Sequence, residues 1–209
     1  MAQSPNLLID TALPPTRTAD EENFPVGSWL LAKRLRTHVA HYYAFARAAD
    51  DIADDPSRSP EGKRTELDAM EAVLRSEAPA AAGNADQDKA ARLAESLAET
   101  KVPVAHAAEL LIAFRLDADK SRYADWDELM AYCRNSAAPV GRYLLDLHGE
   151  SQATWPASDA LCASLQVLNH LQDCGVDYTR MDRVYLPLEM LHVVGADVAE
   201  LSGTSASPA

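Results

Sequence analysis

Residues 43–54 have the sequence YAFARAADDIAD, and this stretch decides the fold class. Tyr43, Arg47, Asp50 and Asp54 are spaced by four, three and four residues, so they fall on one side of an α-helix, which advances about 100° per residue. A stripe at that spacing normally carries apolar core contacts. Here it carries a hydroxyl, a guanidinium and two carboxylates, which predicts a helix whose polar stripe has a task other than core packing.

Acidic residues crowd the C-terminal end of this predicted helix, where Asp51 and Asp55 join Asp50 and Asp54. Like charges four residues apart cost roughly 0.2–0.5 kcal/mol, and acids at a helix C-terminus oppose the macrodipole by about 0.3–1 kcal/mol each. A divalent cation would remove this penalty. Mg²⁺ suits such a site because it prefers carboxylate oxygens and keeps positions for water and phosphate. The alternative is a solvated acidic helix end that Pro56 terminates.

A second polar stripe lies in residues 166–177, QVLNHLQDCGVD. Gln166, Asn169, Asp173 and Asp177 follow one another at intervals of three, four and four in a helix that is otherwise rich in leucine. Polar side chains among leucines are expensive to bury unless they have partners. Two helices that each present a carboxylate pair could face one another across a bundle and hold metal between them. Such a site would let a diphosphate approach an acidic pocket.

The composition excludes several classes of protein. Among 209 residues, 19 Lys and Arg stand against 32 Asp and Glu, a net charge of −13, which argues against nucleic-acid binding because that affinity comes largely from Lys and Arg. No uncharged run reaches the roughly 18 apolar residues of a transmembrane helix, and the first ten residues lack the features of a secretory signal. We therefore expect a cytoplasmic protein. The three cysteines show no CxxC spacing and are expected to be free thiols.

Apolar residues at intervals of three and four, with only 8 glycines, predict an all-α fold. Helices are expected at about 28–55, 60–76, 86–100, 104–118, 126–148, 158–178 and 187–194. Asp125 and Glu128 form a capping box at the start of the helix over 126–148, and Pro139 should kink or interrupt it. We expect residues 1–22 to form a flexible leader, 23–196 the helical domain and 197–209 an irregular tail.

Both polar stripes resemble the aspartate-rich motifs of the squalene/phytoene synthase family. DDIAD at 50–54, preceded by YAFAR at 43–47, resembles the first motif, and NHLQDCGVD at 169–177, followed by RVYLP at 183–187, resembles the second. The resemblance covers about residues 23–195. It implies an isoprenoid-synthase-like helical bundle that acts on an isoprenoid diphosphate with Mg²⁺.

Position by position, the resemblance also implies roles for individual side chains. The Mg²⁺ ligands would be Asp50, Asp54, Asn169, Asp173 and Asp177. The substrate-binding residues would be Arg47, Tyr132, Gln166 and Arg183, with the two arginines on the diphosphate. The catalytic set would be Tyr43, Arg47, Asp50, Asp54, Asp173 and Asp177.

Residues 23–26, NFPV, and the NHLQDC string most resemble the branch of the family that makes hydroxysqualene in bacterial hopanoid biosynthesis. That branch ionises presqualene diphosphate and lets water capture the carbocation, which yields hydroxysqualene and diphosphate. Gln172 favours this branch, since phytoene and squalene synthases usually carry arginine immediately before that aspartate. Two alternatives remain. One is head-to-head condensation of farnesyl diphosphate or a phytoene-type synthesis, and the other is a non-catalytic assembly factor.

Family members continue for several helices beyond the position of Gly195, so we expect a bundle that lacks its closing C-terminal helices. The small residues at 137–141, AAPVG, either make room for isoprenoid chains or simply kink a helix. Because the product would be oily, a peripheral contact with the cytoplasmic face of the membrane is an open alternative. The sequence does not specify an oligomeric state. Glu189 and His192 form one ExxH element, but a di-iron bundle needs two.

Overall fold

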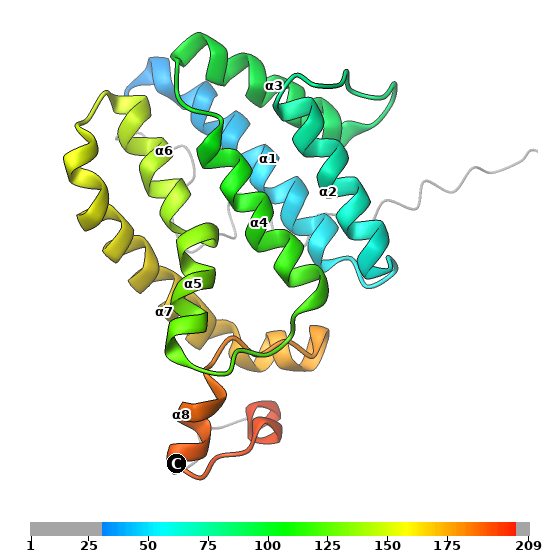
Figure 1. The fold of residues 1–209 in the computed structure, drawn as a ribbon, viewed down its shortest axis with the longest axis vertical. Coiled ribbons are helices and arrows are strands. Elements are labelled where there is room, and N and C mark those ends of the chain that lie inside the picture. The colour runs from blue at the N-terminus through cyan, green and yellow to red at the C-terminus, as the bar shows by residue number, and fades with distance from the viewer. Residues whose placement is uncertain (1–30, 204–209) are drawn as a thin grey trace, which may run out of the picture.

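The computed structural model of the protein describes residues 31–203, which form a bundle of helices (Figure 1). The helices are α1 (Arg36–Asp54), α2 (Pro60–Leu74), α3 (Ala85–Thr100), α4 (Ala105–Asp119), α5 (Trp126–Ser136), α6 (Ala138–His148), α7 (Trp155–Met181) and α8 (Leu188–Val193), with short 3-10 helices η1 (Lys33–Leu35), η2 (Gln152–Thr154) and η3 (Val198–Ser202). Within this range no strand is present, so the all-α prediction is confirmed. The predicted leader, residues 1–22, lies outside the described residues.

Local sequence signals account for several helix boundaries. The hydroxyl of Ser59 accepts a hydrogen bond from the Gly62 N–H at 3.1 Å and so caps α2. Asp125 caps α5 by accepting a bond from the Glu128 N–H at 2.8 Å. The Glu128 carboxylate returns to the N–H of Ala124 at 2.6 Å, one residue earlier than in the predicted capping box.

The predicted interruption at Pro139 is confirmed. α5 ends at Ser136, α6 begins at Ala138, and Ala137 between them has the irregular angles φ −122° and ψ −48°. Pro139 lies in the first turn of α6, where a missing N–H breaks no helical hydrogen bond. The segment expected as one kinked helix is therefore two helices.

Close approach of α6 and α7 explains one of the small residues in the 137–141 segment. A Cβ atom on Gly141 would lie 2.3 Å from Ser158 Oγ and 2.6 Å from Cys162 Sγ. Both distances are well below van der Waals contact. Glycine at this position therefore sets how closely the two helices pack.

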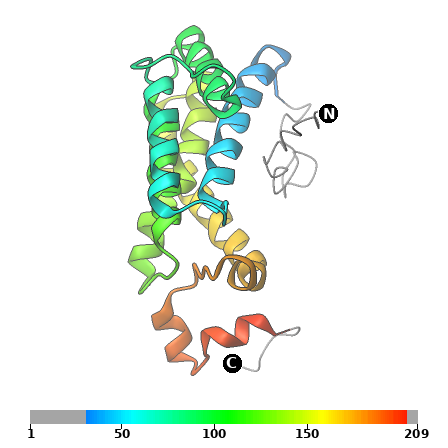
Figure 2. The ribbon, with the colours of Figure 1, turned by 90° about the vertical axis from the view of Figure 1, so that its right-hand side faces the viewer.

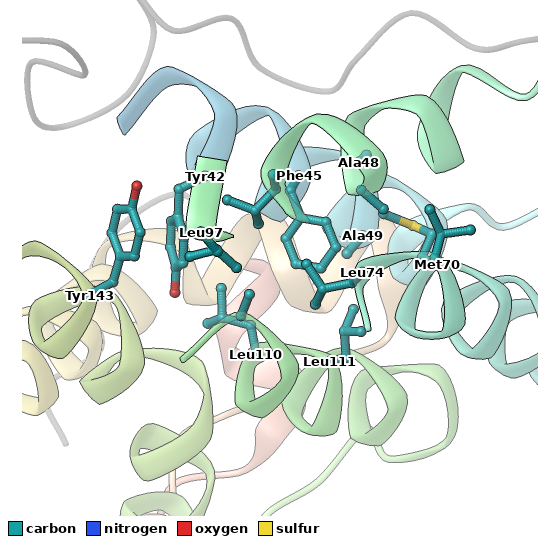
Figure 3. Packing of buried hydrophobic residues seen from close by; sticks show 14 of the residues in the cluster. Tyr42, Phe45, Ala48, Ala49, Met70, Leu74, Leu97, Leu110, Leu111 and Tyr143 are labelled. Atoms are coloured by element: carbon teal, nitrogen blue, oxygen red, sulfur yellow. The ribbon is translucent and has the colours of Figure 1, made fainter. Parts of the chain in front are cut away.

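Five helices, α1 to α4 and α6, share the main hydrophobic core (Figure 3). Phe45 of α1, Leu67 of α2, Leu93 of α3 and Leu111 of α4 are fully buried in it. The face of α1 that points into this core leaves the Tyr43–Asp54 stripe at its margin, where these four side chains are only partly buried. Core packing thus fixes which side of α1 is left for the polar stripe.

A second, smaller cluster lies among α4, α5 and the segment that follows α7. Its buried members are Ala113, Tyr123, Leu129, Tyr132, Cys133 and Tyr185. Tyr123 packs edge to face against Tyr132 with 5.5 Å between ring centroids, Tyr132 is tilted against Tyr185 at 5.1 Å, and Tyr123 stacks on Tyr185 at 5.4 Å. Through this cluster the segment after α7 packs against α4 and α5.

α7 packs along α5 and α6 and leaves much of its apolar surface uncovered by the described residues. Leu161, Leu165, Leu168 and Leu171 are between 50% and 60% exposed, and His170 is the buried residue of the helix. The polar stripe lies on the more covered side of the helix, since Gln166, Asn169, Asp173 and Asp177 are partly buried while these leucines are exposed.

α8 and η3 lie beyond one end of the bundle, as two perpendicular views show (Figures 1 and 2). η3 packs against α7 and falls in the segment expected to be an irregular tail. It is helical because Asp197 and Glu200 form a capping box at its start. No helix among residues 31–203 combines the length and the apolar character that crossing a membrane requires.

Candidate functional site

The acidic end of α1 is held by ion pairs within the protein. Arg47 contacts Asp50 at 2.7 Å and Asp51 at 2.9 Å, one helical turn further on. Tyr43 lies one turn before Arg47 on the same face and is partly buried. The first motif therefore presents its guanidinium and carboxylates together, as the spacing predicted.

Arg183 brings the segment after the second motif to the first motif. Its Nη1 lies 2.7 Å from the Asp54 carboxylate, although 129 residues separate the two in sequence. The Arg183 residue is 6% exposed. A charge-assisted bond between a buried guanidinium and a carboxylate is among the stronger polar contacts in proteins. Both arginines predicted to bind diphosphate thus contact aspartates of the first motif, Arg47 two of them and Arg183 one.

The backbone around Arg183 explains why its side chain reaches α1. α7 ends at Met181, its C-cap residue Asp182 has the left-handed angles φ 52° and ψ 36°, and the Arg183 N–H donates to the Asp177 carbonyl at 3.2 Å. The chain then runs beside the loop between α4 and α5, where the Val184 N–H donates to the Ser121 carbonyl at 2.8 Å. These two backbone hydrogen bonds hold residues 183 and 184 in place, and the Arg183 side chain extends from this fixed backbone toward α1.

Asp117, at the C-terminal end of α4, is a buried acid that the sequence analysis did not single out. Tyr132 donates its hydroxyl proton to Asp117 Oδ2 at 2.7 Å, and Tyr185 donates to Asp117 Oδ1 at 2.8 Å. Burial raises the pKa of Asp117 to about 6, against the lowering effects of Arg183 and the two tyrosine hydroxyls. The acid escaped notice because α4 has an ordinary apolar sequence and its tyrosine partners come from distant segments.

Lys63 of α2 is a second residue missed by sequence reasoning. Its ammonium donates to the Ala53 carbonyl at the end of α1, at 2.7 Å. Burial, and then the neighbouring Arg183, lower its pKa. A cation at this position offsets the negative end of the α1 dipole, where the sequence places four acids.

The remaining predicted cavity residues lie around His170 of α7. Tyr132 is 4% exposed, and its hydroxyl is occupied by Asp117. Gln166 Nε2 lies 3.3 Å from His170 Nε2, and the His170 ring stacks on Tyr185 with 3.8 Å between centroids. Burial lowers the pKa of His170 to about 3, so the ring stays neutral near pH 7. Gln166 and Tyr132 thus border the same buried group, and their contact with substrate stays a prediction.

The second motif lies along α7, with Asn169, Asp173 and Asp177 partly buried and Gln172 exposed. Within residues 31–203, no three His, Cys, Asp or Glu side chains are grouped closely enough to hold a metal ion. α7 packs mainly on α6 and α5. The predicted five-ligand set therefore stays a prediction.

The first motif has the donor chemistry that Mg²⁺ prefers. Asp50 is about one third exposed, with 32% of its side chain accessible, and partial burial together with the nearby Asp54 carboxylate raises its pKa to about 8. Arg47 lowers it without cancelling this effect. Burial and the neighbouring carboxylates together therefore disfavour the charged form of Asp50 more than Arg47 favours it. Because Mg²⁺ is often held by one or two carboxylates, with water and phosphate completing its shell, the Asp50–Asp54 pair fits such an ion.

Comparison with known proteins bears directly on these motifs. A model of the squalene/phytoene synthase family matches residues 17–209. Hydroxysqualene synthase of Rhodopseudomonas palustris is 49% identical over 193 residues, which cover 92% of this chain and 64% of that protein. Hydroxysqualene synthase of Sinorhizobium fredii is 48% identical over 187 residues, which cover 90% of this chain and 62% of that protein. The chain thus spans slightly less than two thirds of the length of these relatives.

The fold agrees with the same family. The crystal structure of squalene synthase HpnC from Alicyclobacillus acidocaldarius superposes with a TM-score of 0.74 and 31% sequence identity, over 91% of this chain and 71% of that chain. The predicted isoprenoid-synthase-like helical fold is therefore confirmed for this part of the molecule. With two motifs in order, a matching family model over most of its length and a shared helical architecture, this chain belongs to the squalene/phytoene synthase family.

Proposed function

We propose that the protein converts presqualene diphosphate and water to hydroxysqualene and inorganic diphosphate in a Mg²⁺-dependent reaction. The observation that carries the proposal is the 2.7 Å contact between Arg183 and Asp54, which joins the two motif regions. The identity of 48–49% to relatives named hydroxysqualene synthase supports this branch over the others.

The two arginines are the proposed diphosphate ligands. Arg47 stands on α1 one turn before Asp50 and Asp51, and Arg183 stands at the far end of the same carboxylate row. Fixed guanidiniums stabilise the charge that develops on a departing diphosphate, and they do so without reorganising during the reaction. Because Arg183 is buried and held at both ends of its segment, it is the better preorganised of the pair.

The proposed Mg²⁺ ligands are Asp50, Asp54, Asn169, Asp173 and Asp177. When bound, Mg²⁺ supplies Lewis-acid stabilisation of the leaving diphosphate. The carboxylates of the first motif also hold Arg47 and Arg183 in place, through the contacts described above. Their removal should therefore affect both cation binding and the orientation of the arginines.

Tyr43, Tyr132 and Gln166 are proposed to line the cavity for the isoprenoid part. Tyr43 lies on the α1 stripe, whereas Tyr132 and Gln166 border His170. The Tyr132 hydroxyl is engaged by Asp117, so this residue would contribute its ring to the cavity wall. Gln166 is the proposed polar contact near the reacting carbons.

Separate incubations test the proposal directly. Purified protein with Mg²⁺ is given either presqualene diphosphate or farnesyl diphosphate, and products are identified by mass spectrometry. Hydroxysqualene from presqualene diphosphate alone is the expected result. Turnover of farnesyl diphosphate would favour head-to-head condensation instead, and tight binding of a partner protein without any turnover would favour an assembly factor.

A binding measurement accompanies the assay because the chain spans less than two thirds of its relatives. Calorimetric titration with inorganic diphosphate, with and without Mg²⁺, reports on the anion site without requiring a closed hydrophobic pocket. We expect binding that strengthens with Mg²⁺. Equal, negligible heats under both conditions would contradict the assignment of this site.

A further inference from the structure

Asp117 lies at the centre of a buried polar cluster in which four separate segments meet. The residue is 7% exposed and belongs to the last turn of α4. Its side chain accepts hydrogen bonds from Tyr132 of α5 and from Tyr185, and its backbone carbonyl accepts a bond from Arg183 Nη2 at 3.0 Å. Arg183 then reaches Asp54 at the end of α1. Every polar group of Asp117 that faces this cluster has a partner.

The carboxylate determines which way the Tyr185 hydroxyl points. A tyrosine hydroxyl has one proton to donate, and Tyr185 gives it to Asp117 Oδ1 at 2.8 Å. Its oxygen lone pairs are then directed to the other side, where Arg183 Nη1 lies 3.4 Å away and donates to it. A tyrosine whose proton pointed toward Arg183 would repel the guanidinium.

Three groups hold the Arg183 guanidinium: the Asp117 backbone carbonyl, the Tyr185 hydroxyl and the Asp54 carboxylate. Of these, the Tyr185 hydroxyl is the one that the Asp117 carboxylate orients. The Asp117 side chain also adds a negative charge close to the guanidinium, since each residue shifts the pKa of the other toward its charged form. A planar guanidinium held from several sides keeps one orientation.

We propose that Asp117 is a positioning residue that orients Arg183 for the diphosphate by fixing the proton of Tyr185. This inference rests on the proposed function, in which Arg183 binds the anion. Asp117 itself touches no substrate in this scheme. It acts through one tyrosine and one arginine, and its loss should weaken anion binding more than it disturbs the fold.

The substitution Asp117→Asn tests this role. Asparagine carries no charge, and it puts an NH₂ donor in place of one of the two carboxylate oxygens that accept from Tyr132 and Tyr185. Because the oriented Tyr185 hydroxyl is lost as an acceptor for Arg183, we expect affinity for inorganic diphosphate in the presence of Mg²⁺ to fall by about tenfold or more. Asp119→Asn is the matched control, since Asp119 is an exposed acid on the same helix that pairs with Arg64. It should leave the affinity unchanged.

A double-mutant cycle separates positioning from a general loss of structure. Tyr185→Phe removes the hydroxyl that links Asp117 to Arg183 and leaves Asp117 in place, so it should weaken diphosphate binding by itself. If Asp117 acts through Tyr185, then Asp117→Asn should cost much less in the Tyr185→Phe background than in the wild type. A purely structural role predicts lower melting temperatures with unchanged affinity.

The outcomes also distinguish this inference from the proposed function. Wild-type protein that fails to bind diphosphate overturns both together. The role of Asp117 alone is overturned if Asp117→Asn leaves diphosphate binding intact. It is also overturned if the effects of Asp117→Asn and Tyr185→Phe on binding are additive. Weakened binding that is not additive, with circular dichroism near that of the wild type, is the result expected here.

Discussion

Replacing Asp50 by asparagine should stabilise the metal-free protein at and above neutral pH. Partial burial and the Asp54 carboxylate raise the pKa of Asp50 from its ordinary value of 3.8 to about 8, and Arg47 offsets only part of this. An ionised Asp50 is therefore unfavourable in the folded state. Asparagine has nearly the same shape and no charge, so it should avoid the cost. On this reasoning, Asp50 serves to bind a cation and lowers the stability of the metal-free protein.

The direction of the pH dependence follows from proton binding. Between about pH 4 and pH 8 the folded protein holds a proton on Asp50 that the unfolded chain has lost, so the free energy of unfolding decreases as pH rises through this range. One pKa unit corresponds to about 1.4 kcal/mol, but solvent reaches 32% of the side chain and screens the repulsion. We expect Asp50→Asn to gain about 1–2 kcal/mol at pH 8, a difference that shrinks toward zero near pH 4.

Asp55 provides a control of opposite sign at the same helix end. Its carboxylate accepts bonds from the Ser57 hydroxyl at 2.6 Å and the Ser57 N–H at 2.9 Å, and it pairs with Arg58 at 2.7 Å. The Ser57 hydroxyl is the main cause of a lowered pKa for Asp55. A lowered pKa contributes stability above the unfolded value that is lost as pH falls through the folded one. Asp55→Asn should therefore destabilise the protein at neutral pH.

Urea unfolding of both variants and the wild type at pH 5.5, 7.0 and 8.5, without divalent cations, measures these differences. Addition of Mg²⁺ at pH 8.5 should then stabilise the wild type and have less effect on Asp50→Asn, because ligand that binds only the folded state adds to stability. Two results would refute the reasoning. One is a variant at position 50 that is less stable than the wild type at pH 8.5, and the other is a stability difference that does not change with pH.

Three further predictions concern other parts of the molecule. Asp173→Ala should abolish Mg²⁺-dependent release of diphosphate while circular dichroism stays near wild type, and retained turnover would remove Asp173 from the proposed metal ligands. Gly141→Ala should lower the free energy of unfolding by about 1 kcal/mol, because overpacking against α7 is only partly offset by the better helix propensity of alanine. Adding Ser158→Ala and Cys162→Ala should restore the stability, since these changes remove the atoms that would lie 2.3 and 2.6 Å from the new Cβ. Asp125→Ala should cost about 1 kcal/mol through loss of the α5 cap, measured by the same urea titration, whereas Asp127→Ala in the first turn should cost less.

The parts of the fold that depend on neighbours in sequence were predictable. Caps at Ser59 and Asp125 and the interruption at Pro139 all arise from contacts within about four residues, so the pattern of the chain contains them. The two motifs were also visible, because their spacing is a helical one. Asp117 was not, since its partners lie 15 and 68 residues away and only packing brings them together.

The surroundings of α7 could be predicted only in part. Among residues 31–203 this leucine-rich helix is packed mainly on one side, by α5 and α6. A leucine-rich pattern specifies that a surface must be covered and does not specify which segment covers it. For the same reason, the helical spacing within each motif could not show whether the two motifs face one another.

The first motif shows how the protein tolerates an acidic helix end before any ion is bound. Arg47 pairs with two of its acids, Arg183 with Asp54 and Arg58 with Asp55, while Lys63 binds the Ala53 carbonyl. The penalty inferred from sequence is thus offset in part by cations that come from α1, α2, their connecting loop and the segment after α7, while Asp50 stays harder to ionise than a free carboxyl group. The chain's net charge of −13 therefore says little about the potential at this site. A diphosphate approaching it would meet guanidiniums already aligned with the carboxylates, and the pairing of Arg183 through Tyr185 and Asp117 makes that alignment a property of the fold.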